Sequence, residues 1–214
     1  MRILAVSDKV MDAVYSPAIR QSFGHVDLVI ACGDLPFYYL EFIATSLNVP
    51  CFLVYGNHDW NIQQAQNGPV TVHPPGWVNL DGKSVCAAGL LLAGLEGGLS
   101  YHPDGLHQYS QEAMRWKALK MLPALLANRL RHGRYLDILV THAPPFGIHD
   151  ASDLPHIGFK VFLTLIERFR PRYLLHGHTH VYGVDPIRTT WRHTEIINVY
   201  PYRVLDIDEG QERL

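Results

Sequence analysis

Five short apolar runs of the sequence each end in side chains that can bind a metal ion or transfer a proton. The residues concerned are Asp8, Asp34, Asn57, His142, His178 and His180. Together they offer two carboxylates, one amide oxygen and three imidazoles, and no thiolate. This set contains too much nitrogen for Mg²⁺ or Ca²⁺ and suits Mn²⁺, iron or Zn²⁺ better. The sequence therefore predicts a transition-metal site, provided that the fold brings these side chains together.

The apolar runs are themselves the elements that must position these side chains. They are nearly continuous in apolar residues, as expected of β-strands buried on both faces. They cover residues 2–6, 26–32, 51–55, 136–140 and 172–176, and two further strand candidates lie at 194–199 and 202–207. Helical patterns cover residues 17–23, 38–47, 111–131 and 159–169. In an α/β sheet, ligands bind outside the carboxyl ends of the strands, so side chains distant in sequence can converge there.

Two predictions concern the segments between these elements. Pro123 should kink or split the long helix at 111–131. Residues 60–83 and 97–110 are expected to be long irregular segments, which tend to carry function in compact domains. The sequence has no internal repeat and no linker of biased composition, so we expect a single domain over residues 1–214.

Composition excludes several classes of protein. The 214 residues carry 18 Lys and Arg against 20 Asp and Glu, and this near-neutral charge argues against long nucleic acid or a membrane surface as a partner. Hydrophobic residues make up 48% and charged residues 18%, which argues against disorder. The three cysteines form no C-x-x-C pair, and the first residues predict a strand rather than a signal peptide. A cytoplasmic protein is expected.

The order of the polar clusters resembles the calcineurin-like metallophosphoesterase family. The matching blocks are Asp8, Gly33-Asp34, Gly56-Asn57-His58-Asp59, His142 in the run THAPP, and Gly177-His178-Thr179-His180. Each block is short, and GNHD alone would also suit a tight turn, but five blocks in order are difficult to obtain by chance. Asp8 and Asp34 would otherwise be ordinary helix-capping residues.

The resemblance implies an α/β (α+β) fold in four layers, with two packed mixed β-sheets flanked by helices. It also implies two divalent transition metals, with manganese preferred over iron or zinc. Asp34 would bridge them, Asn57, His142 and His178 would complete the second site, and Asp8 and His180 would hold the first. A hydroxide between the metals would attack a phosphate ester, and His58 would protonate the leaving group or donate a hydrogen bond to the phosphoryl oxygens.

One position departs from the family pattern. The family's first block is Asp-x-His, whereas this chain has Asp8-Lys9-Val10, and valine cannot bind a metal. The first metal would keep three protein ligands, and its affinity should fall at least 10–100-fold unless another group replaces the histidine. His149, a few residues after His142, is a candidate for that ligand or for a substrate contact, the alternative being an ordinary surface loop.

Two functions therefore remain open. One is an enzyme acting on a small phosphate ester, which can be a monoester, a diester or a pyrophosphate. The other is a metal-poor, catalytically weak family member that acts as a binding or interaction scaffold. The presence of His58 and His142 favours the enzyme, because a scaffold has no use for either. The oligomeric state is not predicted.

Overall fold

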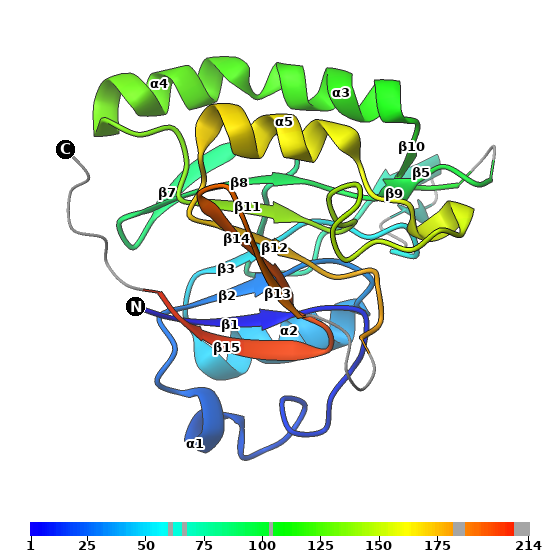
Figure 1. Cartoon of the computed structure of the whole chain (residues 1–214). Helices are drawn as coiled ribbons and strands as arrows, with labels where there is room; N and C mark the ends of the chain where they lie inside the picture. The colour runs from blue at the N-terminus through cyan, green and yellow to red at the C-terminus, as the bar shows by residue number, and fades with distance from the viewer. Residues whose placement is uncertain (60–61, 66–67, 103–104, 182–186, 208–214) are drawn as a thin grey trace.

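In the computed structural model of the protein, the predicted strands form the centres of two β-sheets. The structure describes residues 1–59, 62–65, 68–102, 105–181 and 187–207. For residues 62–65 and 68–71 it describes the backbone alone. Within this part of the chain, one sheet has five strands in the order β15-β1-β2-β3-β6 and the other has six in the order β13-β14-β12-β11-β8-β7. The sheets pack face to face (Figure 1).

The bounds of the five-stranded sheet are β1 Arg2–Val6, β2 Leu28–Ala31, β3 Cys51–Leu53, β6 Trp77–Asn79 and β15 Tyr202–Asp206. Those of the six-stranded sheet are β7 Ser84–Ala87, β8 Leu90–Leu95, β11 Ile138–Thr141, β12 Tyr173–His176, β13 Arg188–Trp191 and β14 Thr194–Asn198. Two small ribbons pair β4 Ile62–Ala65 with β5 Gly68–Thr71 and β9 Gly98–Leu99 with β10 Gln108–Tyr109. The inner strands β1, β2 and β3, and likewise β8, β11 and β12, run parallel.

Side-chain alternation along each strand divides the core into three apolar layers. In β1, Ile3 faces the space between the sheets, whereas Leu4 faces the helices outside. In β11, Val140 and Leu139 divide in the same way, toward the other sheet and toward the outer helices. Both faces of the inner strands are therefore buried, which explains why their sequences are continuously apolar.

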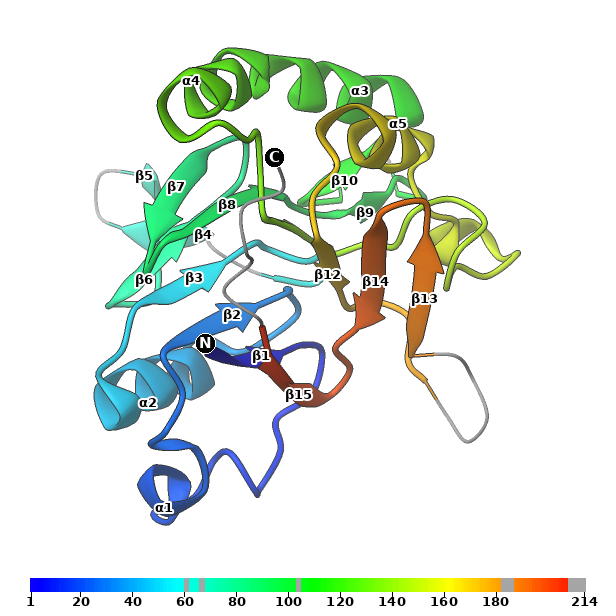
Figure 2. The ribbon, with the colours of Figure 1, turned by 60° about the vertical axis from the view of Figure 1, so that its left-hand side comes forward.

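Helices cover the outer face of each sheet. The five-stranded sheet is covered by α1 Ile19–Phe23 and α2 Phe37–Leu47, and the six-stranded sheet by α3 Gln111–Lys120, α4 Leu122–His132 and α5 Lys160–Phe169. Figure 2 shows these two groups on opposite sides of the paired sheets. The expected four-layer sandwich is confirmed. None of the helices in the described residues is long and apolar enough to cross a bilayer.

The predicted helix at 111–131 is split, as Pro123 required. α3 ends at Lys120, and α4 begins at Leu122 with Pro123 in its first turn, where its missing N–H costs no hydrogen bond. The predictions of irregular segments at 60–83 and 97–110 were wrong in part, because β4, β5 and β6 lie in the first and β9 and β10 in the second. β6 is short and pairs with β3, which is distant in sequence, and no local sequence pattern indicates that pairing. Residues 60–61 and 66–67 of the first segment, and 103–104 of the second, lie outside the described residues.

Candidate metal centre

The predicted ligands follow the carboxyl ends of parallel strands, in left-handed turns. Asp8 follows β1 with φ 61°, Asp34 follows β2 with φ 56°, and His178 follows β12 with φ 66°. Aspartate and histidine adopt this conformation more often than most other residues with a side chain. Each turn diverts the chain at the end of its strand, and the three side chains meet at one edge of the sandwich.

Glycines before the ligands allow these turns to touch. A Cβ atom at Gly56 would fall on the carboxylate of Asp34, and one at Gly177 would fall on the side chains of Ser7 and Asp8. Moving the carboxylates aside would relieve these contacts, but it would also displace two of the predicted metal ligands. The Gly-Asn-His-Asp and Gly-His-Thr-His blocks therefore begin with glycine for lack of space.

Four of the predicted ligands converge on a single point. The Nε2 atom of His142 lies 3.0 Å from Oδ1 of Asn57, 3.4 Å from Oδ2 of Asp34 and 3.0 Å from Nδ1 of His178. Among the described residues, Asp34, His142 and His178 form the one group of three acidic, histidine or cysteine side chains close enough to hold a metal together. This is the set expected for the second metal.

The hydrogen bonds of the two histidines leave a lone pair on each inward nitrogen. Nδ1 of His142 donates to the carbonyl of Cys32 at 2.7 Å, and Nε2 of His178 donates to the carbonyl of Pro155 at 2.8 Å. Since a carbonyl oxygen can only accept, each of these nitrogens carries the hydrogen in the neutral ring. Backbone partners of this kind are typical of metal-binding histidines, whose orientation they fix.

The charges around this point also fit a cation. Burial lowers the pKa of His142, but the charge and hydrogen bond of the Asp34 carboxylate outweigh it and raise that pKa to about 9. Burial alone would raise the pKa of Asp34, and the same pairing lowers it to about 2. Burial, helped by the charge of His142, lowers the pKa of His178 to about 3. A single positive charge is thus favoured between one carboxylate and two imidazoles, and a metal ion would meet that requirement.

The remaining predicted ligands, Asp8 and His180, lie beside this group but are less closely assembled. Oδ1 of Asp8 is 3.9 Å from Nε2 of His180, and Oδ2 accepts the backbone N–H of His178 at 2.9 Å. Burial raises the pKa of Asp8; the charge of His142 opposes this and that of Asp34 adds to it. The ring of His180 is half-exposed and stacks on that of Tyr200 with centroids 4.3 Å apart.

Val10 points away from the metal centre. Its partly buried side chain packs against the apolar layer between the five-stranded sheet and helices α1 and α2, and it does not line the pocket. The chain after Asp8 therefore supplies packing where the family pattern supplies a ligand. The described residues show no other imidazole taking its place beside Asp8 and His180.

A pocket of about 480 Å³ opens over the predicted ligands. It is lined by Asp8, Asp34, Asn57, His58, Tyr101, Pro155, His156, His178 and His180. His58 is exposed, and its backbone N–H donates to Oδ1 of Asp34 at 2.8 Å. The hydroxyl of Tyr101 accepts from Nδ2 of Asn57 at 3.4 Å, so the amide oxygen of Asn57 faces inward.

His149 is not among the pocket residues. Its Nδ1 lies 2.9 Å from Nε2 of the buried His176, and its Nε2 lies 2.8 Å from the hydroxyl of Thr189. These contacts place it behind the turn that carries His178, and not at the open side of the ligands. The expectation of a substrate contact or replacement ligand therefore finds no support in its position.

Three residues near the site were not singled out from the sequence. Asp59 accepts the backbone N–H groups of Asp34, Gly56 and Leu35 at 2.7–3.0 Å, which ties the two ligand turns together. Burial, and then the charge of Asp34, raise the pKa of Asp59 to about 6.

The other two are Tyr101, which comes from an irregular segment, and His156, which ends the short 3₁₀ helix Leu154–His156. His156 packs against the ring of His178 with centroids 5.0 Å apart, and its Nδ1 is hydrogen-bonded to the carboxylate of Asp153. Asp59 stands inside the block that carries Asn57, so a signal for it was present. Tyr101 and His156 had none.

Comparisons with known proteins agree with this geometry. The profile of a family described as calcineurin-like phosphoesterase matches residues 1–182. Among solved structures, TT1561 of Thermus thermophilus aligns with a TM-score of 0.62 at 17% identity, over 92% of this chain and 88% of that one. No curated protein matches the sequence significantly.

Two further solved structures share the fold. Phosphopantetheinyl hydrolase (PptH) from Mycobacterium tuberculosis aligns with a TM-score of 0.57 at 12% identity, over 98% and 97% of the two chains. GAP50 of Plasmodium, described as the anchor in the inner membrane complex, aligns with a TM-score of 0.52 at 14% identity, over 92% of this chain and 70% of that one. At these identities the similarity concerns the fold alone.

Proposed function

Since the chain belongs to the calcineurin-like phosphoesterase family, we propose that it hydrolyses a small phosphate ester at the pocket over Asp34. The observation that carries this proposal is the convergence of Asp34, Asn57, His142 and His178 on one point, with an unshared electron pair on each inward atom. Such a buried set of oxygen and nitrogen donors has no role in packing, and it suits a transition metal better than Mg²⁺.

These four residues would hold one divalent cation, with manganese as the first candidate and iron or zinc as the others. Asp8 and His180, together with Asp34 as the bridging carboxylate, would hold a second. When bound, the cations supply charge neutralisation of the phosphoryl group and an activated water at neutral pH. Because Val10 leaves the group of Asp8 and His180 one ligand short, we expect the metal at that group to be bound more weakly than the other.

The chain's own side chains would bind and orient the ester. His58 extends from the turn that presents Asn57 and lines the open side of the pocket, where it can donate a proton or a hydrogen bond to the substrate. Tyr101 keeps the Asn57 amide turned inward. Among the described residues, no lysine or arginine lines the pocket, so we expect a small substrate rather than long nucleic acid.

The test combines metal content with turnover. Protein incubated with Mn²⁺ should hold metal after gel filtration and should hydrolyse p-nitrophenyl phosphate or bis-p-nitrophenyl phosphate. Asp34→Asn should lower both metal content and turnover by at least about 100-fold. The control Asp12→Asn removes an exposed carboxylate from the same part of the chain and should change neither. Equal metal content in the wild type and in Asp34→Asn would contradict the proposal.

A specific observation keeps a second function in view, namely a scaffold that binds metal weakly and does not turn over substrate. Val10 packs against an apolar layer, so this position contributes to the core where the family pattern has a ligand. The same experiment separates the two functions. Metal bound at the Asp34 group, with no hydrolysis of either ester under any of the three metals, would favour the scaffold.

A further inference from the structure

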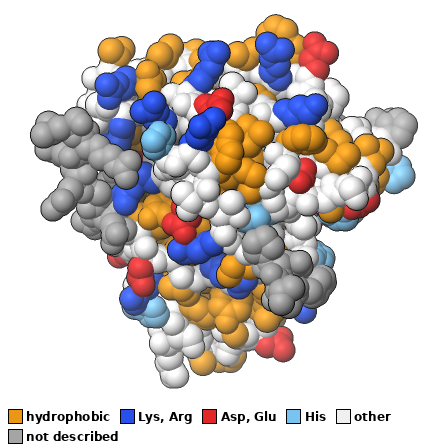
Figure 3. Space-filling view, viewed as in Figure 1, with side chains coloured by type: hydrophobic (Ala, Val, Ile, Leu, Met, Phe, Trp, Pro, Cys, Tyr) orange, Lys and Arg blue, Asp and Glu red, His pale blue; other side chains and the backbone are white. Residues whose placement is uncertain are grey.

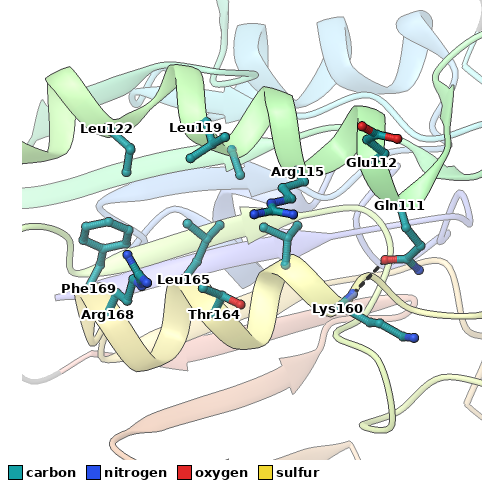
Figure 4. Close-up of a pocket in the computed structure, with 12 residues that line it drawn as sticks. Gln111, Glu112, Arg115, Leu119, Leu122, Lys160, Thr164, Leu165, Arg168 and Phe169 are labelled. Carbon is teal, nitrogen blue, oxygen red and sulfur yellow. Dashed lines mark hydrogen bonds between the residues drawn. The ribbon is translucent and has the colours of Figure 1, made fainter.

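A second and larger cavity lies on the outer helical layer, away from the metal centre. It is a groove of about 690 Å³ between α3 and α5, and it shares no lining residue with the metal pocket. Figure 4 shows the side chains that line it. On the surface above these helices, hydrophobic side chains and Lys and Arg side chains lie interspersed (Figure 3).

The floor of the groove is apolar. Leu165 is buried at the bottom, Leu122 and Phe169 are partly exposed along the side, and Leu119 is 40% exposed. Leu119, Leu122 and Phe169 therefore keep apolar surface in contact with water, and a partner that covered it would be stabilised by the hydrophobic effect.

The rim is positively charged. Arg115 on α3 and Lys160 and Arg168 on α5 are exposed at the groove, against the single carboxylate of Glu112. Within the described residues, Arg115 and Arg168 make no ion pair or hydrogen bond, whereas Lys117 on the same helix as Arg115 is paired with Asp81 and Glu96. Lys160 lies with its ammonium 5.0 Å from the centroid of the Phe146 ring. Arg115 and Arg168 therefore contribute nothing evident to the stability of the fold.

The spacing of these cations identifies the shape of the occupant. Lys160 begins α5 and Arg168 follows eight residues later, a separation of about 12 Å along the helix. Arg115 lies between them on the opposite side of the groove (Figure 4). A lipid with one anionic head would need cations gathered at one end. Cations spread along both sides match an elongated occupant with carboxylates along its length.

The two helices add to the positive electrostatic potential at one end of the groove. Gln111, the first residue of α3, accepts the backbone N–H of Lys160 at 3.0 Å and donates to the carbonyl of Gly158 at 2.9 Å. The amino ends of α3 and α5 thus lie together, and the positive ends of both helix dipoles point the same way.

We propose that this groove binds an acidic amphipathic helix of a partner protein. Its apolar side chains, spaced i, i+3 or i+4, and i+7, would cover Leu119, Leu165 and Phe169, as in other helix-in-groove complexes. Its glutamates or aspartates, on either side of that stripe, would pair with the three rim cations. The docking is independent of phosphoester hydrolysis.

A designed peptide tests the proposal. The probe is a fluorescein-labelled 15-residue helical peptide with leucines at i, i+3 and i+7 and glutamates on both sides, and its binding is followed by fluorescence anisotropy. The expected result is binding at least about 10-fold tighter than that of the same peptide with lysines in place of the glutamates. In the double variant Arg115→Glu/Arg168→Glu the preference should reverse, which also shows that the variant is folded.

The control is Arg131→Glu, which reverses an exposed charge on α4 outside the groove and should leave both affinities unchanged. The proposal is overturned if the wild type binds both peptides alike, or if the double variant keeps its preference for the glutamate peptide. It is overturned equally if oleate competes with the glutamate peptide in the wild type more strongly than unlabelled peptide does, because the groove would then be a lipid site.

Discussion

The ring nitrogens Nε2 of His142 and Nδ1 of His178 face each other at 3.0 Å, and each ring donates its other N–H to a backbone carbonyl. In a metal-free chain, a shared proton must separate these lone pairs. A divalent cation would take the place of that proton and bind both rings at once. The metal site therefore needs both imidazoles.

This relationship predicts the effect of removing one ring. His178→Ala should lose the metal bound at the Asp34 group, because the two oxygen ligands and one imidazole that remain cannot hold it as the full set does. Metal analysis after incubation with Mn²⁺ and gel filtration measures the loss. His132→Ala, which removes an exposed histidine from α4, should retain wild-type occupancy. Unchanged occupancy in His178→Ala would show that the ligand assignment is wrong.

Restoring the absent ligand is the second prediction. Val10→His should tighten binding of the weaker metal by about 10–100-fold, because the polar imidazole can rotate out of the apolar layer that holds Val10 and complete the ligands beside Asp8. The change also removes apolar contacts with the layer under α1 and α2, at a cost of about 1 kcal/mol in the free energy of unfolding. Val10→Ala is the control for that cost and should bind metal as the wild type does. Identical titration calorimetry for all three proteins would contradict the prediction.

The third prediction concerns His58. A general acid contributes about 10²–10⁴-fold, and most where the leaving oxygen is a poor leaving group. His58→Ala should therefore slow hydrolysis of an alkyl phosphate ester far more than that of a nitrophenyl ester, with unchanged metal content. Equal losses on the two esters would leave His58 a hydrogen-bond donor to the phosphoryl oxygens. Loss of metal would make it a structural residue.

Asp59 provides a fourth prediction. Asp59→Asn replaces an acceptor of three backbone N–H groups by an amide that can accept on one side only. Metal affinity should fall by about 10–100-fold although Asp59 touches no metal, and the free energy of unfolding by about 1–3 kcal/mol. Asp27→Asn, which replaces the carboxylate acceptor of the Arg2 backbone N–H by a neutral amide at an exposed strand end, should change only stability. An unaltered metal affinity would show that Asp59 contributes only to the stability of the fold.

The fifth prediction concerns Lys117, which bridges Asp81 at 2.8 Å and Glu96 at 3.1 Å beneath α3. Burial raises the pKa of Glu96, but His107 and Lys117 outweigh it and lower the pKa from 4.5 to about 2. The ionised group therefore stabilises the fold above pH 4.5, and that contribution is lost as pH falls toward 2. Lys117→Met should cost about 2–3 kcal/mol at pH 7, less than for a fully buried pair, since the lysine keeps some exposure.

Urea unfolding at pH 7 and pH 4 measures that dependence. The difference between the wild type and Lys117→Met should shrink at the lower pH, because below pH 4.5 the Glu96 carboxyl takes up a proton in the unfolded chain while it stays ionised in the folded wild type, and without the lysine this loss of stability is smaller. Lys120→Met, an exposed lysine of the same helix, serves as the control and should show little difference at either pH. A difference that grows on acidification would refute the assigned role of Lys117.

The sequence predicted the inner strands other than β8, and the expected ligands lie where these strands end, for a common physical reason. β1 and β12 are buried on both faces, so their runs are apolar throughout and end where the ligand turns begin. The turns themselves need glycine or aspartate, which makes them visible as short motifs. Local pattern and tertiary structure agree at these positions.

The elements that were missed depend on contacts distant in sequence. β8 lies in a glycine-containing apolar run that shows no strand periodicity, and its place in the sheet comes from pairing with β11. Tyr101 reaches the pocket from an irregular segment and His156 from a short 3₁₀ helix, and nothing in the neighbouring sequence indicates that direction. His149 illustrates the converse, because its spacing from His142 suggested the site and its ring lies against His176 instead.

The lack of space at Gly56 and Gly177 has a consequence for how such chains lose their metal. An extra methyl group at either position would force the Asp34 or the Asp8 carboxylate out of place while leaving every ligand in the sequence. A descendant of this protein with alanine at one of these positions would keep all of its metal-binding residues and still be unable to assemble the centre. A search for the ligand residues alone would class it as an enzyme. The alanine in place of the glycine would show that it cannot assemble the metal site.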